Sequence, residues 1–457
     1  MERQADVLVI GGCTAGLFFA ARMAEQGFNV LVADKSPEDD LGRRYDIIHI
    51  GAEHFEAFGL PRPIEGDEDY VTEFTYNISK SALDRWPKGS RNHVLVLRRA
   101  LFIKRLVRRA REKGVNIQFE TEFQKLLFNE KGQIEGAVVR SGGNETIIRA
   151  RLVADCSGIP AVVRTRLPEN YGVENFVTDE RSQFFVVLHY VMLKDESLKI
   201  VPAGWPYYKT WIAPQHVPGG AIIGIGANLS FDYAERCYKR FTGSIALPPN
   251  ELKYTEKSST PYRRPPYSFV ADGFVVLGDA SCITNPWSGE GVPYAWKLCA
   301  IAAEEFGRVM KDGSYPLKEQ TWNVNKRYID EQGAQFAMFL SMLSGFLDCS
   351  AEENDYEFEK SIVFQDDEEK QDGNMMGKIF KGVFTGRISV RSVLKILGAA
   401  SIGKRVLDHY KAYPPTPRDF EAWAKKAEGL WNRAGSMADL ALKEINREEK
   451  TNAKTNH

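Results

Sequence analysis

The chain has 457 residues, 43% of them hydrophobic and 26% charged, which is typical of a globular protein of two or three domains. A formal net charge of -1 gives no electrostatic case for nucleic-acid binding. The absence of a long apolar run and of a signal-peptide pattern predicts a cytoplasmic protein. Six scattered cysteines and seven scattered histidines, without metal-ligand spacing, predict reduced thiols and no metal site.

The first predicted unit is a strand, a turn, a helix and a second strand. Val7 to Ile10 and Val30 to Ala33 are apolar runs typical of buried parallel strands, and Gly27 ends the helix between them. With Asp34 after the second strand, the unit resembles the dinucleotide-binding fingerprint, in which a pyrophosphate lies at the helix N-terminus and the acid binds a ribose. Cys13 stands where that fingerprint has its second glycine.

The remaining pattern predicts an α/β fold with interleaved parts. A Rossmann-like nucleotide-binding domain is expected from 1–61, 93–178 and 266–315, with a basic helix from Arg99 to Lys113. An antiparallel β-sheet substrate domain is expected from 62–92 and 179–265. A helical C-terminal region at 316–445 and a disordered tail at 446–457 follow.

Four separated motifs carry a resemblance to known flavoproteins. They are the N-terminal fingerprint, Arg99, the segment VADCSGIPAVVR at 153–164, and the segment GFVVLGDASCITNPWSGEG at 273–291. Together they resemble flavoproteins of the para-hydroxybenzoate hydroxylase fold, and their spacing is most similar to the geranylgeranyl reductase family. The resemblance is good over about residues 1–300 and weak beyond.

The resemblance implies FAD as the cofactor. It also implies hydride transfer from the N5 atom of reduced flavin to a C=C bond of an apolar substrate, prenyl-like or aromatic. Because no second nucleotide-binding glycine motif is visible, NAD(P)H that binds transiently or a ferredoxin-like donor protein is expected as the reductant.

The family's cofactor residues carry over position by position. Asp279 corresponds to the aspartate that holds the ribityl chain, and Arg99 to the arginine that reaches the phosphates. Ser157 replaces the family's aspartate in the third motif, and its hydroxyl is expected to preserve the turn. The simpler alternatives are a glycine turn before a core helix and a solvated basic face around Arg99. The expected FAD-binding residues are Gly11, Gly12, Cys13, Ala15, Gly16, Asp34, Lys35, Arg43, Arg99, Gly158, Gly278, Asp279, Pro286, Gly289, Glu290, Gly291 and Val292.

The substrate side is less clear. The family has a Tyr-x-Trp-x-Phe-Pro strand that faces the substrate, and the aligned stretch here, Lys209 to Pro214, keeps the tryptophan and the proline. The cysteine-glycine motif that some family members carry is absent, and Tyr45, His49 or His54 is a candidate substitute as the proton donor. The candidate catalytic residues are therefore Trp211, Tyr208 and His49. In the alternative interpretation the aromatic residues fill a core between two sheets.

Several alternatives stay open at this stage. Oxygen activation by the same flavin would make the chain a monooxygenase or hydroxylase of an aromatic substrate, and Lys80 is reminiscent of the lysine of flavin-dependent halogenases. A non-catalytic lipid- or prenyl-binding protein of this fold is a third interpretation, because Cys13 departs from the fingerprint. The amphipathic stretch from Val390 to Tyr413 either lies on a membrane surface, as a peripheral contact, or packs on the domain.

Overall fold

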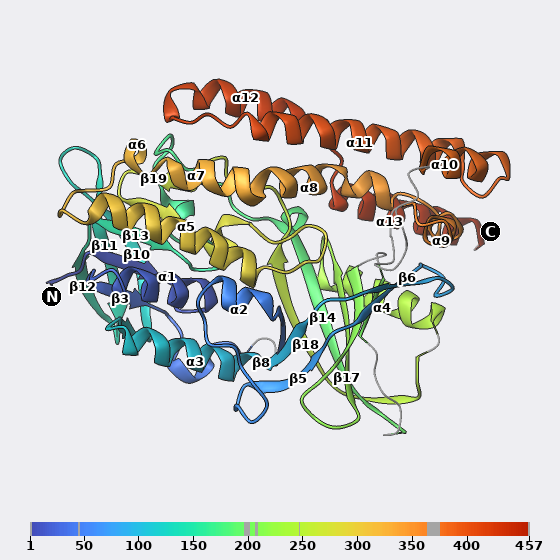
Figure 1. The fold of residues 1–457 in the computed structure, drawn as a ribbon, viewed down its shortest axis with the longest axis horizontal. Helices are drawn as coiled ribbons and strands as arrows, with labels where there is room; N and C mark the ends of the chain where they lie inside the picture. Colours follow the sequence, from blue (N-terminus) through green and yellow to red (C-terminus); the bar gives the residue numbers. More distant parts are fainter. Residues whose placement is uncertain are drawn as a thin grey trace.

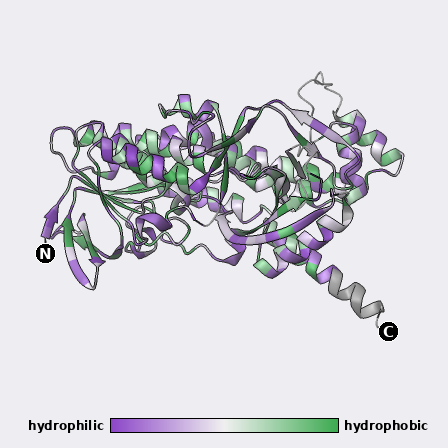
Figure 2. Ribbon diagram, turned by 90° about the horizontal axis from the view of Figure 1, so that it is seen from below, coloured by the Kyte–Doolittle hydropathy of each residue, from purple (hydrophilic) through white to green (hydrophobic). Residues whose placement is uncertain are grey.

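The computed structural model describes residues 2–43, 46–195, 202–205, 209–245, 247–362 and 375–455. Figure 1 shows an elongated molecule, with the part that holds the N-terminus at one end and a large sheet at the other. The C-terminal helices α11 and α12 run along one side of both. In Figure 2 the short strand at the N-terminus is hydrophilic, whereas the strands beside it are rich in hydrophobic residues, as expected for a core.

A six-stranded sheet forms the core of the N-terminal part, in the order β19-β20-β13-β2-β3-β9. Its three central strands are buried at every residue and pair in parallel, because apolar runs without alternation suit a sheet covered on both faces. Helix α1 contacts β2, β3, α3 and α5. This arrangement confirms the predicted α/β fold. The elements are β2 (Val7–Ile10), α1 (Thr14–Ala24), β3 (Val30–Ala33), α3 (Arg99–Glu112), β9 (Asn116–Gln118), β13 (Leu152–Asp155), β19 (Val270–Ala271), β20 (Phe274–Val276) and α5 (Val292–Met310).

A seven-stranded sheet lies at the other end, in the order β18-β14-β17-β16-β15-β6-β7. Adjacent strands in this sheet are antiparallel, except for β15 and β6, which are parallel. Helix α4 (Phe231–Ser244) packs on β14 and β17. The strands are β6 (Asn77–Lys80), β7 (Pro87–Ser90), β14 (Gln183–Leu193), β15 (Ala203–Trp205), β16 (Thr210–Pro214), β17 (Gly220–Ala227) and β18 (Asn250–Pro261).

A three-stranded sheet, β4-β8-β5, packs against the seven-stranded sheet. The membership of this sheet differs from the expected domain division, which assigned all of 62–92 to the substrate domain. Strand β5 (Tyr70–Phe74) pairs instead with β8 (Val94–Arg98), which also pairs with β4 (Ile47–Gly51). The first four residues of β8 are all buried, so apolar neighbours on both sides suit this strand. The exact domain boundaries remain a proposal.

Strands β10, β11 and β12, which follow β9 in the chain, form a separate sheet with the N-terminal strand β1, in the order β1-β12-β11-β10. Strand β11 pairs with β10 and β12 as an antiparallel meander, and the glycines at 132, 142 and 143 in the two connecting turns have positive φ. The strands are β1 (Glu2–Gln4), β10 (Thr121–Phe128), β11 (Ile134–Ser141) and β12 (Asn144–Arg149).

The C-terminal third is helical, and α8 packs along α11. The helix α13 continues through Thr455, so the disordered tail expected at 446–457 is wrong for its described part, where arginine, glutamate, lysine and alanine favour a helix although the segment is polar. Among the described residues no single helix is long and apolar enough to span a membrane, and the helical segments Lys318–Leu347 and Ala351–Glu359, which pass that test only together, are bent by 118°. The helices are α6 (Lys318–Thr321), α7 (Asn323–Tyr328), α8 (Ala334–Leu347), α9 (Ala351–Glu359), α10 (Met375–Phe384), α11 (Val390–Lys411), α12 (Phe420–Trp431) and α13 (Met437–Thr455).

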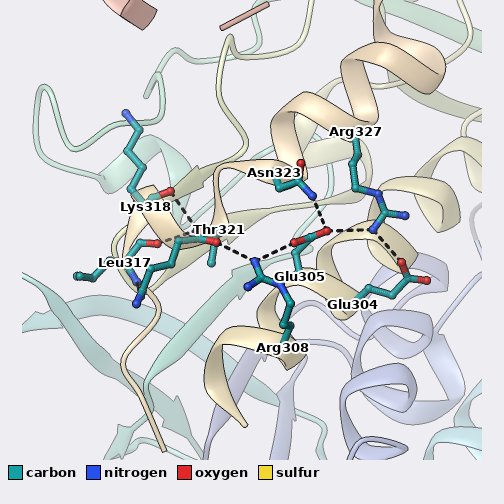
Figure 3. A network of polar contacts seen from close by, with 9 residues as sticks. Glu304, Glu305, Arg308, Leu317, Lys318, Thr321, Asn323 and Arg327 are labelled. Atoms are coloured by element: carbon teal, nitrogen blue, oxygen red, sulfur yellow. Dashed lines mark hydrogen bonds and ion pairs between the residues drawn. The ribbon is translucent and has the colours of Figure 1, made fainter. Parts of the chain in front are cut away.

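A nearly buried carboxylate joins α5 to the helical region. Glu305 of α5 accepts hydrogen bonds from Asn323 at 2.7 Å, Arg327 at 3.1 Å and Arg308 at 3.2 Å (Figure 3). Burial opposes ionisation of Glu305, but the three donors hold its pKa below the ordinary value. The network therefore fixes α7 against the helix whose other end lies at the candidate site.

Candidate functional site

The turn after β2 needs glycine at two positions. Gly11 has φ +106°, and a Cβ there would collide with the backbone oxygen of Cys156. A Cβ at Gly16 would collide with the carbonyl oxygen of Gly11. The start of α1 is therefore packed tightly against β2 and the segment after β13. Ala15 and Gly16 are buried in this contact.

Cys13 occupies the N-cap of α1 in an extended conformation, with φ -100° and ψ -160°. This conformation is accessible to any residue, so the missing glycine causes no backbone strain. Helix α1 has no side-chain cap. Its first N–H groups are thus available for an anion such as a pyrophosphate.

Asp34 is held in place by the turn it faces. Its Oδ2 accepts a hydrogen bond from the N–H of Gly12 at 2.7 Å, and its Oδ1 accepts one from Ser36 at 2.8 Å. Each oxygen keeps a lone pair that can accept a ribose hydroxyl. Lys35 is exposed beside it, and Arg43 is an exposed residue that pairs with Asp40 at 2.7 Å. These two side chains remain predictions as cofactor contacts.

Arg99 links the first and the fourth motif. Its Nη2 donates to the Sγ of Cys13 at 3.9 Å, and its charge acts on Asp279. Burial raises the pKa of Asp279, and Arg99 partly offsets that rise. Gly278, at φ +62°, would place a Cβ 2.8 Å from that of Ala15. Segments far apart in the sequence therefore meet at the N-terminus of α1.

The N-terminus of α5 lies beside Asp279. A Cβ at Gly291, the N-cap of α5, would stand 3.4 Å from the Oδ1 of Asp279. Like α1, α5 has no side-chain cap, and its first residue is Val292. Two uncapped helix N-termini thus flank one partly desolvated carboxylate, which suits a ligand with a negative charge and with hydroxyl donors.

The loop before α5 is held by its own backbone and side chains. Gly289 has φ +83° and donates to the carbonyl of Asn285 at 2.9 Å, while Asn285 donates to the carbonyl of Glu290 at 2.8 Å. Ser288 donates to the Glu290 carboxylate at 3.0 Å, and burial raises the pKa of Glu290. Pro286 is buried. The loop therefore has a defined shape before any ligand binds.

The third motif keeps its turn despite the serine. Ser157 donates through Oγ to Asp155 at 2.6 Å and accepts the N–H of Val162 at 2.8 Å. The other oxygen of Asp155 accepts the N–H of Arg164 at 2.7 Å, and Gly158 has φ +79°. A serine can replace the family's aspartate here because Asp155 supplies the carboxylate.

Taken together, these residues fit FAD. The uncapped N-termini of α1 and α5 suit the pyrophosphate and the pyrimidine end of the flavin, and Asp34 and Asp279 suit the two sugar-like portions. The tight contacts at Gly11 and Gly16 leave the turn in the conformation that a pyrophosphate requires.

Trp211 lies on β16 opposite Gly224 of β17. A Cβ at Gly224 would collide with the indole, so the ring packs directly on that glycine. Trp211 is half-buried against the cluster between the seven-stranded and three-stranded sheets, which includes Tyr190 and Phe74. It therefore borders a sheet-to-sheet core, and its catalytic role stays a prediction. Tyr208 lies outside the described residues.

His49 of β4 lies at the same boundary, with its ring 6.2 Å from that of Phe74. Its Nε2 is buried and has no protein partner among the described residues. Burial lowers the pKa of His49 to about 4, so the imidazole is neutral near pH 7. An unsatisfied buried nitrogen is costly without a ligand or water, which keeps His49 a candidate site residue.

Lys209 contacts the loop before α5, and the sequence did not identify this contact. It donates through Nζ to the carbonyl of Pro286 at 3.0 Å and to that of Trp287. Its position in the aligned strand motif, where the family has an aromatic residue, was the available signal. Lys80, the halogenase-like lysine, pairs instead with Asp84 at 2.7 Å, and its ammonium lies 5.5 Å from the ring of Trp205.

Comparisons with known proteins agree with this geometry. The model of an FAD binding domain matches residues 4–229. The digeranylgeranylglycerophospholipid reductase of Sulfolobus acidocaldarius is 24% identical over 94% of this chain and 98% of its own length, and that of Methanoculleus marisnigri is 27% identical over 68% and 79%. A solved geranylgeranyl bacteriochlorophyll reductase-like structure from Thermoplasma acidophilum has a TM-score of 0.72 and 15% identity, covering 94% of this chain and 100% of that one. The myxobacterial halogenase CndH has a TM-score of 0.60 and 16% identity, covering 92% and 99%.

The fold and the site define an FAD-dependent oxidoreductase with the para-hydroxybenzoate hydroxylase-type fold. The matching FAD binding domain makes FAD its cofactor. Within that class the chain is similar to the digeranylgeranylglycerophospholipid reductases, which agrees with the resemblance that the sequence predicted.

Proposed function

We propose that the chain reduces C=C bonds of a prenyl group carried by a lipid. The observation that carries the proposal is the meeting of Cys13, Arg99, Asp279 and the α5 N-terminus at one FAD site. It is supported by the names of the relatives that match the chain over most of its length. The names of these relatives give digeranylgeranylglycerophospholipid as the molecule that they reduce.

The reaction adds two hydrogens across a double bond. A bound, reduced FAD would supply the hydride for one carbon, and the protein or water would supply the proton for the other carbon. The chain's own residues bind and orient: Asp279 and Arg99 fix the polar part of the cofactor, while Trp211 supplies an apolar wall. The apolar surroundings of Trp211 exclude water from that side.

His49 is proposed as a proton relay rather than as an acid. An imidazole with a pKa of about 4 holds almost no imidazolium at pH 7, so it has no extra proton to give. It can still pass a proton by accepting one at one ring nitrogen as the other releases one. NAD(P)H or a ferredoxin-like protein is proposed as the external electron donor.

Product analysis tests the proposed reaction. The protein loaded with FAD, reduced without oxygen and given a geranylgeranylated glycerophospholipid is expected to yield products heavier by two hydrogens per double bond. Products that gain an oxygen atom in air, from an aromatic substrate only, would favour the monooxygenase alternative. A protein that binds the lipid without changing it would favour the non-catalytic interpretation.

A peripheral membrane contact is proposed for the surface formed by α10 and the first half of α11. Phe380, Phe384, Val390 and Leu394 are 66%, 93%, 61% and 65% exposed there. Residues 375–400 carry five basic residues and no acidic one, which suits an anionic bilayer. Other residues of α11, such as Ile396 and Val406, are buried, so the helix both packs on the protein and exposes apolar side chains. The acidic run 366–372, which precedes α10, lies outside the described residues.

Vesicle sedimentation tests this contact without any turnover. The protein is expected to bind phosphatidylglycerol vesicles, and Phe380→Ser/Phe384→Ser is expected to weaken binding by about tenfold or more. Leu252→Ser, on β18, is the matched control, because Leu252 is an exposed apolar residue away from this surface. Equal binding by all three proteins, or none by the wild type, would contradict the contact and leave the proposed reaction untouched.

A further inference from the structure

Lys209 lies directly before β16 and joins that strand to the loop that precedes α5. Its ammonium donates to two successive backbone carbonyls, those of Pro286 and Trp287. Charge-assisted hydrogen bonds of this kind are about twice as strong as neutral ones. The lysine thus joins the substrate-side sheet to the segment that ends at Gly291.

The surroundings of Lys209 are aromatic. Nζ lies 5.9 Å from the ring centres of both Tyr262 and Trp287. Tyr262 stacks on Phe184 at 3.6 Å and donates its own hydroxyl to the carbonyl of Pro286. Two donors, one directly before β16 and one directly after β18, therefore converge on the carbonyl of Pro286.

The backbone of Lys209 indicates that this contact is specifically built. Its φ of +45° lies in the left-handed region, which is unfavourable for a residue with a long side chain. Surrounding structure must hold such a residue in place, and residues of this kind gather at functional sites.

We propose that Lys209 is a positioning residue that fixes the Pro286–Gly291 loop for FAD. It does so through the Pro286 and Trp287 carbonyls, and its positive charge lies behind the loop whose far end adjoins Asp279. The inference rests on FAD binding and not on the identity of the substrate. A cation near the flavin loop favours the reduced, more negative flavin over the oxidised one.

The positioning depends on pH near neutrality. Burial lowers the pKa of Lys209 from 10.5 to about 7. Below pH 7 the charged ammonium binds the two carbonyls, and above pH 7 the amine is neutral and the bonds weaken.

Other ionisable groups face Lys209 or its loop from three parts of the chain. Tyr262, which directly follows β18, has a pKa that burial raises. Glu444 of α13 lines the same narrow cavity as Lys209 and accepts the hydroxyl of Tyr233 of α4 at 2.7 Å. Glu290, on the loop itself, has a raised pKa because it is buried, and Ser288 and His54 oppose that rise.

The test measures FAD affinity and midpoint potential between pH 6 and pH 8 for the wild type and Lys209→Met. At pH 6 the wild type is expected to bind FAD about tenfold more tightly than Lys209→Met does. At pH 8 the FAD affinities of the two proteins are expected to be equal. The midpoint potential of Lys209→Met is expected to be lower than that of the wild type at pH 6 only.

Two further variants separate charge from structure. Lys209→Arg keeps a charge at every pH used, so it is expected to lack the change near pH 7. Tyr262→Phe removes the neighbouring bond to Pro286 and is expected to weaken FAD binding while keeping that change. If Lys209→Met does not fold, the pH profiles of FAD binding by Lys209→Arg and Tyr262→Phe, compared with that of the wild type, still test the role of Lys209. Equal pH profiles for the wild type, Lys209→Met and Lys209→Arg would overturn the inference.

Discussion

The Nη2 of Arg99 donates to the Sγ of Cys13 at 3.9 Å, so the residue that departs from the glycine fingerprint lies against the arginine expected at the cofactor phosphates. Cys13 is partly exposed and lies at the N-cap of α1 with an ordinary backbone conformation. The departure therefore changes the surface that meets a pyrophosphate and leaves the fold intact.

The first prediction concerns Cys13→Gly. Because φ at Cys13 is -100°, glycine is not needed there, and FAD affinity is expected to change by less than about threefold. The free energy of unfolding is expected to fall by about 0.5–1 kcal/mol, since glycine gains freedom in the unfolded chain. Fluorescence titration of FAD and urea denaturation check the two values. FAD binding that tightens more than tenfold would show that the thiol obstructs the cofactor.

The second prediction concerns Asp279→Asn. Burial raises the pKa of Asp279, so the charged carboxylate is less favourable in the folded protein than in the unfolded chain at pH 7. The variant without FAD is expected to be at least as stable as the wild type, whereas its FAD affinity is expected to fall by about tenfold or more. Thermal unfolding with and without FAD measures both. Loss of stability with unchanged FAD affinity would assign Asp279 a purely structural role.

The third prediction uses the contact between Trp211 and Gly224. Gly224→Ala is expected to displace the indole and to destabilise the protein by about 1–3 kcal/mol through overpacking. Trp211→Ala removes the same ring without overpacking. Both are expected to lower turnover while FAD remains bound, as read by flavin absorbance and lipid product. Normal turnover by Trp211→Ala would make the ring part of the core alone.

The fourth prediction concerns pH and His49. The pKa of His49 is lowered to about 4 from 6.5, so between these values the unfolded chain binds a proton that the folded protein does not. Because of His49, the free energy of unfolding of the wild type falls as the pH falls from 6.5 towards 4. His49→Phe is expected to lack this part of the pH dependence. The difference between the two unfolding free energies, measured by urea denaturation at several pH values, gives the result. A constant difference across this range would contradict a neutral, buried His49.

The sequence predicted the parts of the fold that local pattern controls. Apolar runs such as Val7–Ile10 became buried parallel strands, and the glycine at 11 took the positive φ that its place in the turn requires. Pairing between distant strands was less accessible: β5 joins β8 because of packing across the small sheet, which no local pattern encodes. The tail beyond 446 is polar, yet its described part extends the helix α13.

The site divides in the same way. Asp279 and Gly291 follow from a motif with fixed spacing, and the structure brings them together. The role of Lys209 depends on a contact between segments about eighty residues apart, so sequence alone gave only a mismatch with the family's aromatic residue.

The most direct test of the central claim is the absorbance spectrum of the protein loaded with FAD, reduced without oxygen and then given the geranylgeranylated lipid. The oxidised flavin bands, near about 370 and 450 nm, are expected to vanish on reduction and to return when the lipid is added without oxygen. A protein that takes up no FAD, or a reduced flavin that stays reduced until air is admitted, would contradict an FAD-dependent alkene reductase.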